Sequence, residues 1–279
     1  ESELFHEINY ELDESYGERE VPRFGIKPEF NNIIKLFHGP PKIKCDSIVI
    51  PITENWTPIS KISHMLMNGA GPLYLEYIYY LKKIRIYCNT GDVVNVTGYN
   101  LPCKHIIHTC PPIYNDHFPV ASENAINSCY WRILELSVDL GCKTLLIPII
   151  YPPKFFSEHL AVHILCRTLR RFLEKYYTCF NSIIISVNND NQIQLYTRIL
   201  TIYFPRDNID LKYSNKYMPE YTGNETGSTI VKIRKLNVPL TPLSFLDKRN
   251  NRILNERRQS KLIKINKLND TNNNDNNDD

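Results

Sequence analysis

The stretch that decides the fold spans residues 91–112 and reads Gly-Asp-Val-Val-Asn-Val-Thr-Gly-Tyr-Asn-Leu-Pro-Cys-Lys-His-Ile-Ile-His-Thr-Cys-Pro-Pro. Within it, residues 105–108 form a short run rich in β-branched side chains, a pattern typical of a buried strand. Four similar runs lie outside the stretch, at 33–37, 47–50, 145–147 and 183–185. The sequence therefore predicts a series of short, continuously apolar strands.

Helical patterns lie between or after most of these strands. In residues 121–140 and again in 157–176, apolar side chains recur at the three- and four-residue spacing of an amphipathic helix. Short apolar strands that alternate with helices favour a sheet covered on both faces, with parallel strands joined by right-handed crossovers. The predicted class is α/β in three layers, with a mixed, largely parallel central sheet.

Charge is distributed unevenly along the 279 residues, although the net charge is only +3. Residues 1–20 carry eight acids against Arg19, a local charge of −7 that predicts a solvated, disordered leader. Residues 247–268 carry +6 and are followed by an Asn/Asp-rich end. We expect a folded domain over residues 21–236, with a charge near +8, and a low-complexity tail over 237–279.

Several classes of protein are disfavoured by the sequence. No apolar run approaches the ~18 residues of a membrane span, and the acidic beginning is not that of a signal peptide. These features predict a cytoplasmic or nuclear protein. The eight cysteines are scattered without a Cys-x-x-Cys pair, so we expect reduced thiols and no metal site. His163 and Cys166 are two potential ligands, but no second pair accompanies them.

Five strings follow one another along the chain: Ala70-Gly71-Pro72, Thr90-Gly91-Asp92, Gly98-Tyr99-Asn100-Leu101-Pro102, Ile106-Ile107-His108-Thr109 and Arg170-Arg171-Phe172-Leu173-Glu174. They resemble, in this order, the motifs of the macro domain, a family that recognises ADP-ribose. A second set of strings resembles one subgroup of that family and extends the likeness over residues 21–236. These strings lie at 121–124, 128–130, 163–164, 167–168, 203–206, 217–219 and 223–227. The resemblance implies a three-layer α/β/α fold.

The residues that should hold the ligand depart from the family. In macro domains an Asp that follows a glycine contacts the adenine amine, whereas here Gly39 is followed by Pro40, which offers neither a carboxylate nor an N–H. An Asn that orients the distal ribose and the attacking water in hydrolytic members corresponds to Thr53. A threonine hydroxyl does not replace the paired donor and acceptor of an amide.

Both phosphate-binding loops lack glycine. The family uses glycines there because the pyrophosphate is held by closely approaching backbone N–H groups. Here the first loop reads Glu54-Asn55-Trp56-Thr57-Pro58-Ile59-Ser60, and the second reads Tyr151-Pro152-Pro153-Lys154-Phe155-Phe156-Ser157. Each lost partner is worth about 1–3 kcal/mol. Four altered elements would remove most of the ~8 kcal/mol of a micromolar complex.

If a small ligand binds, we expect it over the carboxyl ends of the strands, near Thr53, Asn55, Lys154 and Tyr196. The family often places a ring near the adenine at the position of Tyr196, although a place at the edge of the core would also explain this residue. Lys154 offers a charge for a phosphate. Asp190 is expected to cap the helix that carries Tyr196.

His108 and Cys110 are two residues apart on a strand and lack a third orienting group, so we predict no catalytic residues there. Three functions remain open. The preferred hypothesis is a degenerate macro domain that acts as a non-catalytic binding or interaction module, without a cofactor. The second is an ADP-ribose-binding domain or ADP-ribosyl hydrolase. The third is binding of RNA or an anionic membrane through the basic body and tail. A protein partner that binds the tails is also considered.

Overall fold

A computed structural model describes residues 24–39, 41, 43–152 and 154–229 of the chain. The predicted boundaries at 20/21 and 236/237, and with them the acidic leader and the tail, lie outside the described residues. The prediction of a protein partner that binds the tails therefore also falls on residues that the structure does not describe.

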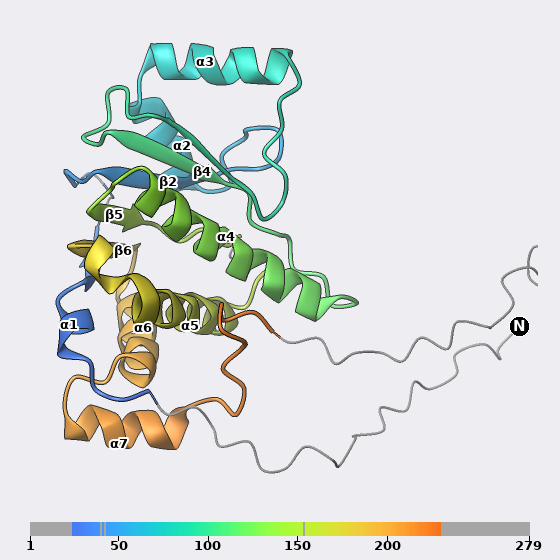
Figure 1. Ribbon diagram of the computed structural model, residues 1–279. Coiled ribbons are helices and arrows are strands. Elements are labelled where there is room, and N and C mark those ends of the chain that lie inside the picture. Colours follow the sequence, from blue (N-terminus) through green and yellow to red (C-terminus); the bar gives the residue numbers. More distant parts are fainter. Residues whose placement is uncertain (1–23, 40, 42, 153, 230–279) are drawn as a thin grey trace, which may run out of the picture. The chain divides into compact units, whose positions relative to one another are not determined.

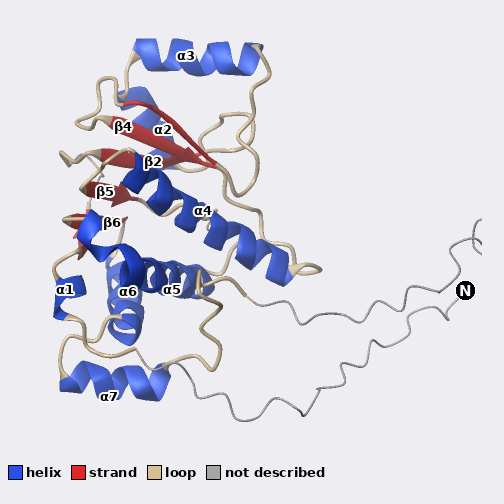
Figure 2. Ribbon diagram, viewed as in Figure 1, coloured by secondary structure: helices blue, strands red, loops and turns tan. Residues whose placement is uncertain are grey.

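A six-stranded sheet with the order β1-β6-β5-β2-β4-β3 forms the centre of the domain (Figures 1 and 2). Every pairing in it is parallel except that of β3 with β4, so the sheet is mixed and largely parallel, as the sequence predicts. The strands are β1 (Ile34–His38), β2 (Ser47–Pro51), β3 (Val93–Thr97), β4 (His105–Thr109), β5 (Thr144–Ile147) and β6 (Ser182–Val187).

Helices cover both faces of this sheet. The two long helices expected from periodicity are confirmed as α4 (Pro119–Asp139) and α5 (Glu158–Tyr176). The others are α1 (Pro28–Asn31), α2 (Lys61–Gly69), α3 (Pro72–Lys83), α6 (Asp190–Tyr203) and α7 (Asn208–Tyr217), with a short 3₁₀ helix at Tyr177–Cys179.

The core is divided by the sheet because side chains alternate between the two faces of each strand. Ile48 and Ile50 of β2 pack with residues of α2 and α3, whereas Val49 between them packs with residues of α4, α5 and α6. All three are fully buried. Such a strand has to be apolar on both faces, which explains the continuous apolar runs in the sequence.

The motif at 98–102 is a piece of scaffold. A Cβ on Gly98 would clash with the backbone carbonyl of Cys103, and a Cβ on Gly71 would clash with the side chain of Asn100. The N–H of Asn100 donates to the carbonyl of Ala70 at 3.2 Å. The two glycines thus permit the loop before β4 to pack tightly against the α2–α3 junction.

The segment 224–229 is held against α4 and α5 by the buried side chain of Asn127. Its amide nitrogen donates to the Thr168 hydroxyl at 2.7 Å and to the Thr226 carbonyl at 3.1 Å, while its oxygen accepts from the Ser228 hydroxyl at 2.7 Å. Gly227 lies in this contact at φ +79°, where a Cβ would be 3.2 Å from the Asn127 amide. The strings shared with the subgroup at 128–130, 167–168 and 223–227 adjoin or form this contact, so they too belong to the scaffold.

Candidate functional site

The five parallel strands all end at one edge of the sheet, where open α/β sheets bind their ligands. The loop after β2 carries Thr53 and Asn55, and the loop after β5 carries Lys154. All three side chains are exposed. The structure therefore places these three residues near the carboxyl ends of the strands, where the sequence predicts them.

Residues 52–58 form a tight hairpin. The N–H of Trp56 donates to the Thr53 carbonyl at 2.9 Å, the N–H of Thr57 donates to the Thr53 hydroxyl at 3.2 Å, and the N–H of Thr53 donates to the Thr57 carbonyl at 2.8 Å. Ile52 and Pro58 form the bridge that closes it. The hairpin therefore uses for its own closure three N–H groups that a phosphate loop would turn toward its ligand.

Trp56 occupies the third position of this hairpin loop with a left-handed backbone, φ 59°. Glycine is the residue usually found at such a position, because a Cβ is strained there. The indole is completely buried, its ring lies edge-on to His108 at a centroid distance of 5.3 Å, and its Nε1–H donates to the Ile86 carbonyl at 2.7 Å. The left-handed turn is thus retained without glycine, and the side chain fills the core beneath the hairpin.

His108 and Cys110, considered from sequence as a base and a nucleophile, are both buried. Burial lowers the pKa of His108 to about 4, and its Nε2 lies 3.1 Å from the Tyr74 hydroxyl. Burial likewise raises the pKa of the Cys110 thiol. Near neutral pH the imidazole is uncharged and the thiol is protonated, so this pair has the properties of core residues.

In the loop after β5, backbone N–H groups likewise form hydrogen bonds within the loop. The N–H groups of Phe155 and Phe156 both donate to the Pro152 carbonyl, at 3.0 and 3.1 Å. Phe156 is buried against the rings of Tyr114 and Tyr151, whereas Phe155 is 56% exposed. The aromatic ring of Phe156, rather than a glycine-lined space, therefore underlies the second loop.

A partly buried polar network joins this loop to α5 and α6. The Tyr151 hydroxyl donates to Glu158 Oε1 at 2.9 Å, and Gln192 Nε2 donates to the same oxygen at 2.7 Å. The Asn188 N–H donates to Gln192 Oε1 at 2.9 Å, which extends the network to the end of β6. These contacts tie together three of the segments that surround the edge.

Tyr196, the fourth candidate ligand residue, lies in the core. Its side chain is 1% exposed, and burial, reinforced by the neighbouring Tyr151, raises its pKa well above the usual range. The structure therefore brings Tyr196 beside the network of Tyr151 and Glu158, and not to the surface that carries Thr53, Asn55 and Lys154.

The expected cap of α6 was wrong by one residue. Asn189 is the N-cap, and its side-chain oxygen accepts from the Gln192 N–H at 2.9 Å. Asp190 is the first residue of the helix, where its negative charge interacts favourably with the positive end of the helix dipole. Its Oδ1 lies 3.8 Å from Nδ1 of His38. A capping side chain accepts from the N–H two or three residues ahead, and the side chain of Asn189 does so with Gln192, three residues ahead.

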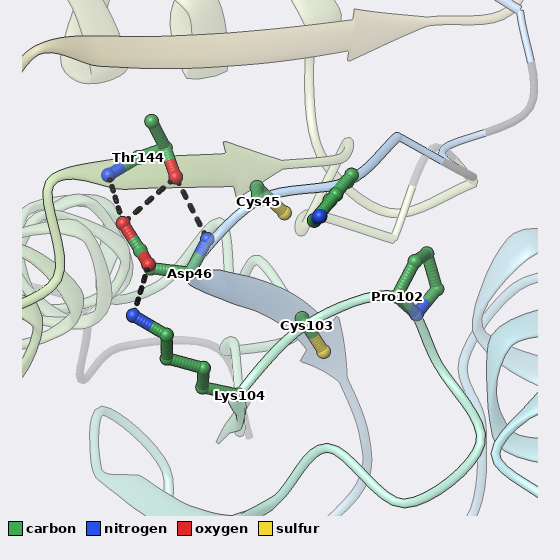
Figure 3. Close-up of a pocket in the computed structure, with 7 residues that line it drawn as sticks. Cys45, Asp46, Pro102, Cys103, Lys104 and Thr144 are labelled. Carbon is green, nitrogen blue, oxygen red and sulfur yellow. Dashed lines mark hydrogen bonds and ion pairs between the residues drawn. The ribbon is translucent and has the colours of Figure 1, made fainter.

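A pocket of about 510 Å³ lies at the opposite edge of the sheet, where β2, β4 and β5 begin (Figure 3). Its central acid, Asp46, pairs with Lys104 at 2.9 Å and accepts from the hydroxyl of Thr144 at 2.9 Å, and from the N–H groups of Lys143 and Thr144. The hydrogen bond from Lys104, supported by Thr144, lowers the pKa of Asp46 to about 2. Asp46 thus serves to join the starts of three strands.

Two further features concern metals and membranes. His163 Nδ1 lies 3.1 Å from the Tyr203 hydroxyl, and Cys166 is fully buried, so neither is arranged as an open ligand. Within the part of the chain that the structure describes, no helix has the length and apolar character needed to cross a membrane.

Comparison with known proteins supports the family suggested by the motifs. The sequence model of the family "Macro domain" matches residues 51–152. The "Protein GDAP2 homolog" of Dictyostelium discoideum is 33% identical over 227 residues, which cover 80% of this chain and 39% of that protein. "Ganglioside-induced differentiation-associated protein 2" of Danio rerio is 29% identical over 226 residues, which cover 80% and 44%. The chain thus spans about two fifths of the length of these relatives.

Solved structures show the same relationship. A Trypanosoma brucei macrodomain crystallised in complex with ADP-ribose is 20% identical to this chain, with a TM-score of 0.53. The match covers 63% of this chain and 76% of that one, and it shows the shared fold. The crystal structure of the GDAP2 macro domain is 30% identical with a TM-score of 0.62, and the match covers 66% of this chain and 90% of that one. With this identity over nearly the whole of that domain, the chain belongs to the macro domain family.

Proposed function

We propose that this chain is a non-catalytic macro domain that acts as a binding and interaction module, with its ADP-ribose site closed by its own side chains. The observation that carries the proposal is the hairpin at 52–58, in which Trp56 is buried and three backbone N–H groups are bonded internally.

Each of the two phosphate loops supports this proposal through the loss of donors. In the hairpin, the N–H groups of Thr53, Trp56 and Thr57 are occupied, and in the second loop those of Phe155 and Phe156 bond the Pro152 carbonyl. To bind a pyrophosphate, the loops would have to exchange these bonds for new ones, so the net gain per phosphate contact is small. An affinity inherited from the family is therefore expected to be lost.

The groups that would recognise the rest of the ligand are also altered. Thr53 stands where the family has the Asn that orients the ribose and water, and its hydroxyl already accepts from the Thr57 N–H at 3.2 Å. Tyr196, at the position of the ring near the adenine, is buried in the core. These features favour the non-catalytic hypothesis over an ADP-ribosyl hydrolase.

Calorimetric titration of the chain with ADP-ribose tests the closed site. We expect no saturable heat at ligand concentrations up to about 100 μM. Dissociation tighter than about 10 μM, equivalent to roughly 7 kcal/mol, would refute the proposal, because the described donors do not supply that much. In that case the exposed candidates are Thr53, Asn55 and Lys154, and Lys154→Gln should weaken binding if the lysine contacts a phosphate.

Catalysis is tested separately by incubating the chain with a mono-ADP-ribosylated protein and measuring the released ADP-ribose. We expect no release above the background rate. Release that is abolished by Thr53→Ala but retained by Thr57→Ala would establish an enzyme. Thr57 is a matched control because it lies in the same hairpin and contributes its backbone N–H and carbonyl to it.

A further inference from the structure

The strand β1 pairs on one side only. It is the terminal strand of the sheet, and its neighbour is β6. At its start the Ile33 carbonyl accepts from the Ile183 N–H at 2.7 Å, and at its end the Gly39 N–H donates to the Val187 carbonyl at 3.2 Å. Because the parallel register between these two bonds is continuous, the odd-numbered residues of β1 bond β6, and the even-numbered ones direct their backbone groups away from it.

The outward-facing backbone groups belong to Ile34, Leu36 and His38. Within the part of the chain that the structure describes, their N–H and C=O groups have no hydrogen-bond partner. A row of free donors and acceptors with the spacing of a strand is complementary to the backbone of another extended segment. The free edge of β1 therefore defines the class of occupant, which is an added β-strand.

A groove of about 900 Å³ lies beside this edge, and we call it the β1 groove. It is lined by residues of α1, β1, α6 and the segment from α6 into α7, and Figure 1 shows α1 and α6 next to each other. Ile34 and Leu36 line it from β1, and Leu200 and Phe204 line it from the end of α6. Because side chains alternate along a strand, an added segment would direct every second side chain into this apolar space.

The β1 groove is also basic. Lys35 and Arg206 line it and are exposed, and neither forms an ion pair with another described residue. Asp210 is the one acid among the lining residues, and its carboxylate accepts from the backbone N–H of Arg206 at 3.1 Å. An occupant that carries acids is therefore complementary in charge.

One segment of this chain has both properties. Residues 7–13 read Glu-Ile-Asn-Tyr-Glu-Leu-Asp, so that Ile8, Tyr10 and Leu12 alternate with polar side chains. Strict alternation is typical of a strand with one buried face. The segment contains three acids and no base, a charge of −3. It lies outside the residues that the structure describes.

The described chain begins close enough for this segment to reach the groove. The ring of Phe24 lies 5.8 Å from that of Tyr203, at the end of α6. Because Asp190 at the start of α6 lies 3.8 Å from His38 at the end of β1, Phe24 lies where β1 begins. Residues 14–23 span up to about 33 Å, whereas β1 is roughly 17 Å long. An added strand that runs opposite to β1 needs the shortest connection.

We propose that residues 7–13 dock in the β1 groove as an antiparallel strand added to the free edge of β1. The register that turns all three apolar side chains toward the groove and brings an acid to Lys35 is unique in its pairs. These are Ile8 with His38, Tyr10 with Leu36, Glu11 with Lys35, and Leu12 with Ile34. The proposal replaces the disorder expected from charge for these seven residues alone, and it does not depend on the closed ADP-ribose site.

The same chain is favoured as the source of the strand because the segment is tethered to the groove. A short connection raises the effective concentration of a segment to the millimolar range, which a separate molecule rarely reaches. Docking would also cover an edge that otherwise offers a template for pairing with other chains. A segment from a second copy, or from another protein, is distinguished by the test.

The test is amide hydrogen exchange in the full chain, measured residue by residue by NMR. We expect the N–H groups of Leu36 and His38 to be protected. Those of Lys35 and Phe37 bond β6 in any case and serve as an internal reference. The α protons of Glu11 and Lys35 should give a nuclear Overhauser effect, because residues of a non-hydrogen-bonded antiparallel pair have Cα atoms only about 4.5 Å apart.

Paired substitutions in the leader test the apolar contacts. Ile8→Ser with Tyr10→Ser removes two cross-strand apolar pairs and should accelerate exchange at Leu36 and His38 at least about tenfold. Leu4→Ser with Phe5→Ser removes two apolar side chains of the same leader outside residues 7–13 and should leave both exchange rates unchanged. Neither pair alters the charge of the chain.

A charge exchange tests the register. Glu11→Lys places like charges opposite each other and should accelerate exchange at Leu36 about threefold, and adding Lys35→Glu should restore the original rate. Glu3→Lys changes the net charge of the chain equally and should have no effect. Circular dichroism should show that all variants fold, because Lys35 is exposed and the other substituted residues lie outside the described domain.

Several results would overturn the proposal. These are rapid exchange at Leu36 and His38 in the unmodified chain, equal acceleration by the two serine pairs, and failure of the charge exchange to restore protection. Protection that rises with protein concentration would assign the β1 groove to the leader of a second copy. Protection that appears only when another protein is added would assign it to a partner's strand.

Discussion

Trp56 is a position where the backbone and the side chain have opposite requirements, and this conflict can be measured. Its left-handed backbone, φ 59°, favours glycine, whereas its indole is fully buried and bonded to the Ile86 carbonyl at 2.7 Å. We predict that Trp56→Gly is more stable than Trp56→Ala, although both are less stable than the unmodified chain. In a helix or strand the order of glycine and alanine is the reverse.

The magnitudes follow from the two contributions. Truncation of a buried aromatic side chain to alanine costs about 3–5 kcal/mol, which includes the cavity that remains. A left-handed conformation costs a residue with a Cβ roughly 1–2 kcal/mol relative to glycine. Part of that advantage is offset because glycine has a more disordered unfolded state. Trp56→Gly should therefore be about 1 kcal/mol more stable than Trp56→Ala.

The assay is urea denaturation followed by circular dichroism, because a fluorescence signal would change when one of the two tryptophans is removed. Thr197→Ala and Thr197→Gly are the control pair, since Thr197 is exposed within α6 and there glycine should be about 1 kcal/mol less stable than alanine. If glycine is no better than alanine at position 56, the left-handed turn does not carry the strain that we assign to it.

Three further predictions concern the scaffold. Gly98→Ala should lower the free energy of unfolding by about 1–3 kcal/mol, because a Cβ there would clash with the backbone carbonyl of Cys103. Gly141→Ala is the control: at φ +67° with open space around it, it should cost about 1 kcal/mol. Equal losses of stability in denaturation would contradict the assigned clash at Gly98. Asn127→Asp loses two donors and should cost about 2–3 kcal/mol and increase protease cleavage near 224–229, and unchanged cleavage would argue against this contact. Burial lowers the pKa of His108 from 6.5 to about 4, so the unfolded chain takes up a proton first and stability should fall as pH falls from about 6.5 to 4. His108→Gln should flatten that decline in urea titrations at several pH values, and an equally steep decline would show that His108 is not its source.

Four of the five strands that the sequence predicts lie in the interior of the sheet, and the fifth, β1, is an edge strand in which only Ile34 is buried. Runs such as 47–50 and 183–185 are apolar on both faces, and the structure has them as β2 and β6 in the interior of the sheet. Val93–Thr97 was not among the predicted strands; it forms β3, which lies at the edge and has Val96 as its one buried side chain. The helix α7 was missed for a similar reason, since it buries only Ser214. Elements with little buried surface leave a weak periodic signal.

The candidate site was predictable in position but not in arrangement. Because parallel strands end at one edge, the sequence places Thr53, Asn55 and Lys154 there, and the structure has them exposed near that edge. The pattern did not show that Tyr196 is buried beside Tyr151, or that Asn189 rather than Asp190 caps α6. The burial of Tyr196 depends on the rotation of α6 about its axis, which is set by packing against α5, α7 and β1, whereas the cap depends on the residue at which the helix begins.

By itself, the sequence determined the layered α/β fold, because alternating runs of apolar residues are local properties of the chain, and its motifs indicated the family through their resemblance. It also showed that glycine is missing from the two loops that correspond in position to the family's phosphate-binding loops. Only the tertiary structure decided what replaces the glycines: Trp56 turns inward beneath the hairpin, and the loop N–H groups bond neighbouring carbonyls. The physical reason is that burial and hydrogen bonding depend on segments distant in sequence, such as Ile86 beside Trp56, which the order of residues does not specify.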